Sequence, residues 1–315
     1  MTGTAPLQEL RSQLDSLSTE AHRPELAEID TLPTEDLVRL MNAEDAKVPA
    51  ALEAAAPQLA RAADAVAERM RRGGRLIHVG AGTAGRMGVL DSAECPPTFN
   101  TAPGQVVGVI AGGLDAMLGA VEGAEDDADG ALAALRELAL TPRDTVVGIS
   151  ASGRTPFALG AVRYARAAGA LTIGLSCNAE SEIGRAADLA LDLVVGPEFL
   201  TGSTRLKAGT AQKLVLNTLS TVVMIKLGKT YGNLMVDVRA SNDKLRARSR
   251  RIVALATGAD EAAIEAALTA ADGEVKNAIL MLLAGVDAPS AARLLSEHAG
   301  HLRQALPAPQ TPGAA

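Results

Sequence analysis

The chain contains very few aromatic residues, and this scarcity narrows the functions open to it. Only 2% of its 315 residues are aromatic, with two Tyr, three Phe and no Trp. Little is therefore available for stacking on bases. The net charge of −7 also argues against a nucleic-acid partner, because phosphate backbones attract basic surfaces. The basic run 246–251 is an exception, but such a run on a helix is more typical of a solvated face or an interface.

Cysteines and long apolar runs are scarce as well. Cys95 and Cys177 lie in separate apolar segments and have no metal-ligand spacing, which indicates a reducing compartment and no metal site. No segment reaches the ~18 uninterrupted apolar residues of a membrane span. The first 30 residues lack the apolar core of a signal peptide. We therefore expect a cytoplasmic protein with no membrane partner.

Short apolar runs alternate with helical patterns through the middle of the chain. This alternation predicts an α/β fold with a doubly wound, mainly parallel sheet that helices cover on both faces. Ligands bind such sheets beyond the carboxyl ends of the strands. The expected strands are 76–79, 106–110, 145–149, 171–175 and 189–195, and a helix expected over 49–72 stops at Gly73-Gly74.

The chain divides by composition into four parts. Residues 1–45 are polar and form an N-terminal arm, and residues 46–255 form the main domain. Alanine-rich helical patterns in 256–305 predict a small three-helix domain, and the Pro-rich residues 306–315 predict a disordered tail. Support of packing or of a dimer is the expected role of the small domain, with a separate binding function as the alternative.

A glycine-rich loop, Gly80–Gly88, follows the first expected strand. Glycines let the backbone approach an anion, and a helix that starts there offers unpaired amides. Gly80-x-Gly82-x-x-Gly85 formally matches the dinucleotide fingerprint, but that fingerprint needs an acidic residue at the end of the next strand, where this chain has Ala111-Gly112-Gly113. The loop therefore indicates phosphate binding in general, and the nearby Glu94 is the first candidate acid or base.

Two further segments carry groups suited to an anion. Three hydroxyls and a glycine fall within Ser150–Thr155, directly after the third expected strand and before a helical pattern. Such residues can cradle a phosphate, although Ser and Thr also serve often as helix caps. In the segment 196–213, Arg205 and Lys207 could neutralise an anion and residues 201–204 could line its pocket; a solvated Arg and Lys near a helix start is the alternative.

Several of these segments together resemble one known family. It is the N-acetylmuramic acid 6-phosphate etherase family, and the resemblance covers roughly residues 19–255. It implies a sugar isomerase (SIS) domain that binds a phosphosugar, works as a homodimer and uses no metal or organic cofactor. The implied reaction cleaves the D-lactyl ether of the substrate to N-acetylglucosamine 6-phosphate and D-lactate. The matching runs are Gly80–Phe99, Val121–Asp126, Gly148–Pro156, Leu200–Lys213 and Gly232–Val238.

The implied chemistry needs an acid and a base. In the ring-opened sugar the adjacent aldehyde acidifies the C2 proton, so one group removes this proton while another protonates the departing lactate oxygen. The resemblance assigns Glu94 as the acid and Glu125 as the base. Glu94 lies beside Cys95-Pro96-Pro97, where we expect burial to raise its pKa. Glu122 and Asp126 remain rivals of Glu125, which could also belong to an acidic run without a chemical role.

Ten positions form the predicted binding set, and two features depart from the family pattern. Ala84 stands where the family usually has a serine, for which Thr83 could compensate, and His22-Arg23 stand where Arg-Asn is usual. The predicted substrate and phosphate ligands are Gly82, Thr83, Arg86, Ser150, Ser152, Gly153, Thr155, Ser203, Thr204 and Lys207.

Two other functions fit part of the pattern. An aldose–ketose phosphosugar isomerase would share the fold, the phosphate loops and a carboxylate base, but it would not need the segment Glu94–Pro97. A non-catalytic phosphosugar sensor usually adds a DNA-binding helix pair or a second sugar domain, and neither pattern is evident in the sequence.

Overall fold

A five-stranded parallel sheet forms the centre of the first part of the chain. The computed structural model describes residues 14, 17–238 and 243–307, which form two compact units: one within 1–93 and 104–220, the other within 94–103 and 221–315. The sheet lies in the first unit, and its strand order is β2-β1-β3-β4-β5. Its strands are β1 (Leu76–Gly80), β2 (Val106–Ile110), β3 (Thr145–Ile149), β4 (Leu171–Ser176) and β5 (Leu189–Asp192).

The strand order places a switch point beside β1. The chain crosses from β1 to β2 on one side and then returns to β3 on the other, so loops after β1 and β3 leave the sheet in opposite directions. Gly80 and Ile149, the last residues of these strands, are register partners. A crevice at such a position is where ligands bind in doubly wound sheets. The α/β fold and the presence of the five expected strands are confirmed, but the strand expected over 189–195 ends at Asp192.

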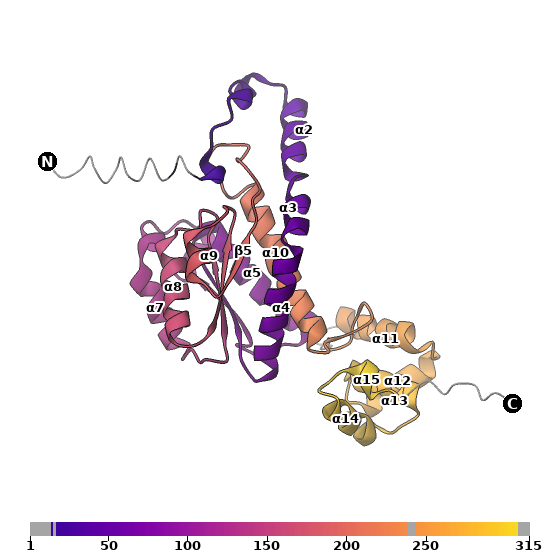
Figure 1. Cartoon of the computed structure of the whole chain (residues 1–315). Helices are drawn as coiled ribbons and strands as arrows, with labels where there is room; N and C mark the ends of the chain where they lie inside the picture. Colours follow the sequence, from indigo (N-terminus) through magenta and orange to yellow (C-terminus); the bar gives the residue numbers. More distant parts are fainter. Residues whose placement is uncertain (1–13, 15–16, 239–242, 308–315) are drawn as a thin grey trace. The chain divides into compact units, whose positions relative to one another are not determined.

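Helices cover both faces of the sheet, as Figure 1 shows. Ile77 and Val79 on β1 pack with α7 and α8, whereas the intervening His78 points toward α5. This alternation follows from the two-residue side-chain period of a strand. The helices of this layer arrangement are α4 (Ala56–Arg71), α5 (Gly82–Phe99), α7 (Ala128–Glu137), α8 (Pro156–Ala167), α9 (Glu182–Ala186) and α10 (Lys207–Lys226).

Helix α5 packs closely on β1 and β2 because a glycine stands at each contact. Gly108 on β2 lies against Val89 of α5, and Gly88 on α5 lies against His78 of β1. A Cβ atom on Gly108 would lie 2.6 Å from the Cα of Val89, and one on Gly88 would lie 2.9 Å from the Cβ of His78. Part of the glycine-rich pattern after β1 therefore serves helix–strand packing, not anion binding.

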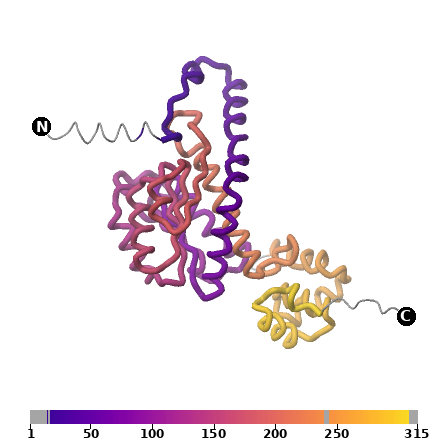
Figure 2. Tube along the Cα trace, viewed as in Figure 1, coloured from indigo at the N-terminus to yellow at the C-terminus, as the bar shows by residue number. Residues whose placement is uncertain are grey.

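The N-terminal segment leads into a long column of helices (Figure 2). The predicted helix over 49–72 is present as α3 and α4, and it ends as expected: Gly73 has φ +82°, and the amide of Gly74 donates to the carbonyl of Arg69. The elements before α4 are η1 (Ser18–Glu20), η2 (Pro24–Leu26), η3 (Ile29–Thr31), α2 (Thr34–Asp45) and α3 (Val48–Ala54), and two short ones, α6 (Asp115–Leu118) and η4 (Ala124–Asp126), precede α7.

The second unit is mainly helical and has its own apolar core, which includes Ile252, Val253, Ile264, Val275 and Ile279. Side-chain caps from Asp260 and Asp287 begin two of its helices. Its elements after α10 are a hairpin of β6 (Thr230–Tyr231) and β7 (Leu234–Met235), then α11 (Asp243–Thr257), α12 (Glu261–Ala270), α13 (Val275–Ala284), α14 (Ala288–Glu297) and α15 (Leu302–Ala305).

The predicted division into residues 1–45, 46–255, 256–305 and 306–315 stays a prediction, and residues 308–315 of the predicted tail lie outside the described part. Within the described ranges, no single helix is long and apolar enough to cross a membrane. The pair α13 and α14, bent by 103°, meets the length and composition criteria only together.

Candidate functional site

The loop after β3 gathers three hydroxyl groups around one point. The Ser150 hydroxyl lies 2.9 Å from that of Thr155 and 3.3 Å from that of Ser152. The Gly153 amide donates to the Ser150 hydroxyl at 3.0 Å, and the Arg154 amide donates to the Ser152 hydroxyl at 3.2 Å. The loop is thus a compact, prearranged turn with hydroxyl groups on its inner side.

The backbone of this loop explains why it contains a glycine. Gly153 has φ +74°, a conformation that strains other residues, and a Cβ there would lie 2.4 Å from the Cβ of Ser181. Thr155 occupies the N-cap position of α8, yet its side chain accepts no hydrogen bond from that helix. The helix-cap interpretation of Thr155 is therefore not what the structure has: the start of α8, whose first residue is Pro156, has no side-chain cap from Thr155.

The loops after β1 and β2 border a cavity of about 380 Å³, and its lining residues include none from the Ser150–Thr155 loop. Gly82 begins α5 with φ +53° and lines this cavity together with Arg86. The Arg86 guanidinium donates to the carbonyl of Gly119 at 2.9 Å, so it ties α5 to the loop after β2. In this arrangement, Arg86 supports the wall of the cavity, and its predicted contact with substrate stays a prediction.

Glu125 lines the same cavity. It is exposed on η4, and of its two predicted rivals Glu122 also lines the cavity, whereas Asp126 is not among the lining residues. Glu125 therefore shares a cavity with Gly82 and Arg86, and of its two rivals only Glu122 lines the same cavity.

Glu94 is more exposed than its sequence context suggested. It belongs to the second unit and is exposed on α5, while the next residue, Cys95, is only 2% exposed. Consecutive residues on a helix point about 100° apart, so an apolar neighbour does not bury the residue before it. The expectation that the chain itself buries Glu94 was wrong.

The prolines after Glu94 lie inside α5. Because proline has no amide hydrogen, the carbonyls of Ser92 and Ala93 lose the donors that Pro96 and Pro97 would otherwise supply. The helix beside Glu94 is thus held by fewer backbone bonds than an ordinary helix.

Ser203 and Thr204 precede α10 in a turn of intermediate exposure. The Thr204 carbonyl accepts the amide of Gly209, and the methyl group of Thr83 lies 3.1 Å from where a Cβ of Gly209 would be. Thr83, Thr204 and the first turn of α10 therefore lie together. Ala84 is buried, with 7% exposure.

Lys207 is buried and paired with a carboxylate, so it is neither a solvated lysine nor one whose ammonium is unpaired. It is 1% exposed, and its ammonium lies 2.7 Å from the carboxylate of Glu44 on α2. Arg23 and Lys47 contact the other oxygen of that carboxylate at 2.8 and 2.7 Å. Although burial alone would raise the pKa of Glu44, the hydrogen bonds from Lys207, Lys47 and Arg23 hold it at about 2.

Glu198 is a second buried carboxylate that the sequence analysis missed. It is fully buried and accepts the amides of Lys207 and Ala208 at 2.9 Å each, so it caps the start of α10. Burial raises its pKa, against the opposing effect of these amide donors. Glu44 lies 163 positions from Lys207, so no local spacing marks it as a partner; Glu198 lies only nine positions away, and its role as a cap was not recognised in the segment 196–213.

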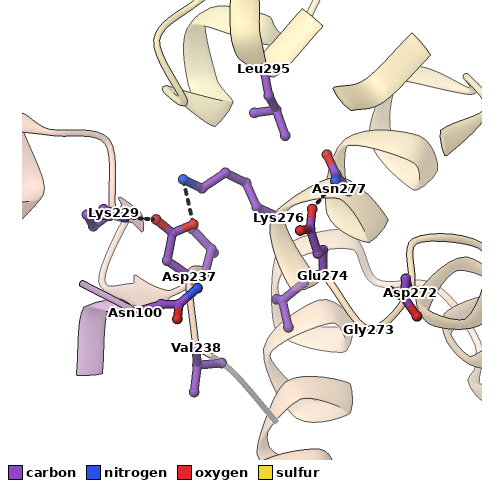
Figure 3. Close-up of a pocket in the computed structure, with 12 residues that line it drawn as sticks. Asn100, Lys229, Asp237, Val238, Asp272, Gly273, Glu274, Lys276, Asn277 and Leu295 are labelled. Atoms are coloured by element: carbon purple, nitrogen blue, oxygen red, sulfur yellow. Dashed lines mark hydrogen bonds and ion pairs between the residues drawn. The ribbon is translucent and has the colours of Figure 1, made fainter. Parts of the chain in front are cut away.

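A separate polar cavity of about 620 Å³ lies in the second unit (Figure 3). Asp237 lies between two ammonium groups there, 3.0 Å from that of Lys229 and 2.6 Å from that of Lys276. None of the predicted site residues lines it. No group of three or more His, Cys, Asp and Glu side chains suited to a metal ion occurs in the described ranges.

Two family models match overlapping parts of the chain. The SIS domain model matches residues 120–222, and the glucokinase regulatory protein N-terminal SIS domain model matches residues 58–166. Together with the five-stranded parallel sheet, these matches identify an SIS-domain protein.

Curated relatives narrow the class further. The N-acetylmuramic acid 6-phosphate etherase of Streptomyces coelicolor is 70% identical over 308 residues, which are 98% of this chain and 99% of the relative. The protein of the same name from Rubrobacter xylanophilus is 59% identical over 294 residues, covering 93% of this chain and 97% of the relative. The chain belongs to the N-acetylmuramic acid 6-phosphate etherase family, and it is an enzyme of the lyase class.

Proposed function

We propose that this enzyme cleaves the D-lactyl ether of N-acetylmuramic acid 6-phosphate, with water, to N-acetylglucosamine 6-phosphate and D-lactate. The observation that carries the proposal is the identity of 70% over nearly the whole length of a relative with that name. The two loops at the β1/β3 switch point supply a fitting place for a phosphosugar.

The phosphate group belongs, in this proposal, on the loop Ser150–Thr155. Its clustered hydroxyls and the uncapped start of α8 offer donors to phosphate oxygens. Gly82, Thr83, Ser203 and Thr204 would border the sugar, because Thr83 and Thr204 lie together at the start of α10.

The reaction proceeds by elimination and then addition. A base removes the C2 proton of the open-chain sugar, the bond between C3 and the lactyl oxygen breaks, and an acid gives its proton to that oxygen. Water then adds its oxygen to C3 of the unsaturated aldehyde, and a proton returns to C2. We assign Glu125 as the base, since it lines the cavity beside Gly82 and Arg86, and Glu94 as the acid.

The exposure of Glu94 places a condition on this assignment. A general acid that keeps its proton near neutral pH needs a pKa raised by burial or by neighbouring negative charge. In the isolated chain Glu94 is exposed. The substrate, with its phosphate and carboxylate, or a second copy of the chain must therefore cover Glu94 during turnover.

A homodimer would supply such a cover. Leu114 is 81% exposed and Leu118 is 96% exposed on the segment that leads to Glu125, and large exposed apolar side chains in one segment are typical of interaction surfaces. We propose that this segment joins two copies. Two buried cysteine thiols fit a reducing cytoplasm, where an enzyme recycling peptidoglycan sugars would act.

The direct test incubates the purified chain with N-acetylmuramic acid 6-phosphate and measures D-lactate and N-acetylglucosamine 6-phosphate. Equal amounts of both products are expected. Interconversion of an aldose phosphate and a ketose phosphate without lactate would instead identify an isomerase, and ligand binding without turnover would identify a sensor.

A further inference from the structure

Asn178 connects the N-terminal segment to the loop after β3. It is 6% exposed and follows β4. Its side-chain oxygen accepts the backbone amide of Ser18 at 2.8 Å and the Ser18 hydroxyl at 2.9 Å. Its side-chain nitrogen donates to the Thr19 hydroxyl at 3.1 Å and to the carbonyl of Ala151 at 2.9 Å.

These partners fix the orientation of the Asn178 amide. A backbone amide can only donate and a carbonyl can only accept, so Ser18 requires the oxygen of Asn178 and Ala151 requires its nitrogen. The Ala151 carbonyl also accepts the amide of Cys177 at 3.0 Å. Ala151 lies between Ser150 and Ser152, so the buried side chain of Asn178 and the backbone amide of Cys177 together hold the hydroxyl-rich loop at Ala151.

A second buried contact joins the N-terminal segment to the start of α10. Glu44 pairs with Lys207, the first residue of α10, whose amide is capped by Glu198. Residues 17–47 therefore contact the loop after β3 through Asn178 and the start of α10 through Glu44. Both contacts lie within the first unit.

We propose that Asn178 is a positioning residue for phosphate binding: it sets the Ser150–Thr155 loop by bonding Ala151, and the Ser18–Thr19 turn completes this support. The inference rests on the proposed function, because that function places the substrate phosphate on this loop. The Ser18–Thr19 turn then supports the phosphate site through Asn178.

The proposal predicts a specific kinetic signature. The phosphate keeps its contacts in both the ground state and the transition state, so a disturbed loop weakens the binding of both alike. Such a change raises KM and leaves kcat nearly unchanged. For Asn178→Ala we expect KM to rise about tenfold, in line with the loss of a buried hydrogen-bond network.

Two variants separate positioning from general stability. Asn178→Asp keeps the acceptor for Ser18 but places a carboxylate against the Ala151 carbonyl, so KM should rise at least as much as in Asn178→Ala. Thr19→Val keeps shape and burial but removes one acceptor of Asn178, so KM should rise by a smaller factor. A variant with the wild-type melting temperature separates an effect on KM from an effect on stability. Thr19→Val, which removes one hydroxyl and keeps the shape of the side chain, is the mildest of these changes.

Matched controls exist in the same chain. Asn277 is a buried asparagine with 9% exposure in the second unit, so Asn277→Ala removes a similar group far along the chain from the loop. Thr145, fully buried at the start of β3, has a hydroxyl without a hydrogen-bond partner among the described atoms. Both Asn277→Ala and Thr145→Val should keep the wild-type KM.

The experiment measures kcat and KM for D-lactate release, with active-site content normalised, and the Kd of N-acetylglucosamine 6-phosphate by calorimetry. A raised KM and Kd with kcat within about twofold supports the proposal. A fall in kcat or melting temperature at unchanged KM and Kd overturns it. If the wild type binds the sugar phosphate but releases no lactate, the proposed function fails, and the Kd values still decide the role of Asn178.

Discussion

At the scale of single residues, the account depends on two carboxylates with separate tasks. Glu125 lines the cavity between the loops after β1 and β2, and Glu94 is exposed on α5. Removal of the C2 proton and departure of lactate can be followed separately, because exchange of the C2 proton with solvent reports the base alone. Each assignment therefore has its own measurement.

Glu94→Gln should slow D-lactate release by about 10²- to 10⁴-fold, the usual contribution of a positioned general acid. Exchange of the C2 proton with deuterium from solvent should persist, because the base remains. Near-normal lactate release in this variant would remove the acid role from Glu94.

Glu125→Gln should abolish both C2 exchange and lactate release. Asp126→Asn is the matched control, because Asp126 neighbours Glu125 but is not among the residues that line the cavity, and it should retain both. If exchange survives in Glu125→Gln and disappears in Glu122→Gln, the base is Glu122.

The position of the Ser150–Thr155 loop could be predicted from the sequence, but the contacts of Lys207 and the exposure of Glu94 could not. Strands and loops follow from local periodicity, so the loop at Ser150–Thr155 was found where β3 ends. The partners of Lys207 were missed because Glu44 precedes it by 163 positions, and such contacts depend on how α2 returns to α10. The exposure of Glu94 was misjudged because neighbours in sequence lie on different faces of a helix.

At the scale of elements, close packing of α5 on the sheet and the pairing of α2 with α10 hold the candidate site in place. The first depends on backbone approach at glycines. The second depends on a buried carboxylate with three cationic partners. Each makes a prediction about stability.

Gly108→Ala should destabilise the protein by about 1–3 kcal/mol or more, because the new Cβ would lie 2.6 Å from the Cα of Val89 and backbone must move to admit it. Denaturant unfolding measures the change. Gly119→Ala, where a Cβ meets nothing within 4 Å, is the control and should shift stability little. Equal effects from both would contradict the close-packing argument.

Glu44 should make the first unit sensitive to acid. Its folded pKa of about 2 lies below its ordinary value of 4.5, so its stabilisation is complete above pH 4.5 and is lost as the pH falls toward 2. The size is on the order of 2 to 3 kcal/mol. Unfolding measured between pH 6 and about pH 3 tests this.

Glu44→Gln should lower stability at neutral pH, because Lys207 is left buried without a counter-charge, and should flatten the acid dependence. Glu35→Gln changes an exposed carboxylate, 74% exposed beside Arg39, and should alter neither. An unchanged acid slope in Glu44→Gln would contradict the assigned pairing.

At the scale of the whole molecule, the account requires that Glu94 be covered during turnover. Leu114 and Leu118 offer an exposed apolar surface for a second copy. Leu118→Glu should shift sedimentation equilibrium toward the monomer and lower lactate release. Leu255→Glu, at a position 63% exposed on α11, is the control. A wild-type chain that is monomeric at assay concentrations would contradict the dimer and leave the substrate as the only cover for Glu94.

The most direct test of elimination followed by addition is the reaction of wild-type enzyme with N-acetylmuramic acid 6-phosphate in water labelled with both ¹⁸O and deuterium. Both products are analysed by mass spectrometry after the exchangeable anomeric oxygen of the sugar has been returned to ¹⁶O in ordinary water. The account predicts one deuterium atom at C2 and one ¹⁸O atom at C3 of N-acetylglucosamine 6-phosphate, and D-lactate without ¹⁸O, because the C2 proton is lost to solvent, the C3–oxygen bond breaks and water adds to C3. Label of ¹⁸O in the lactate instead of the sugar, or ¹⁸O at C3 with no deuterium at C2, would contradict it.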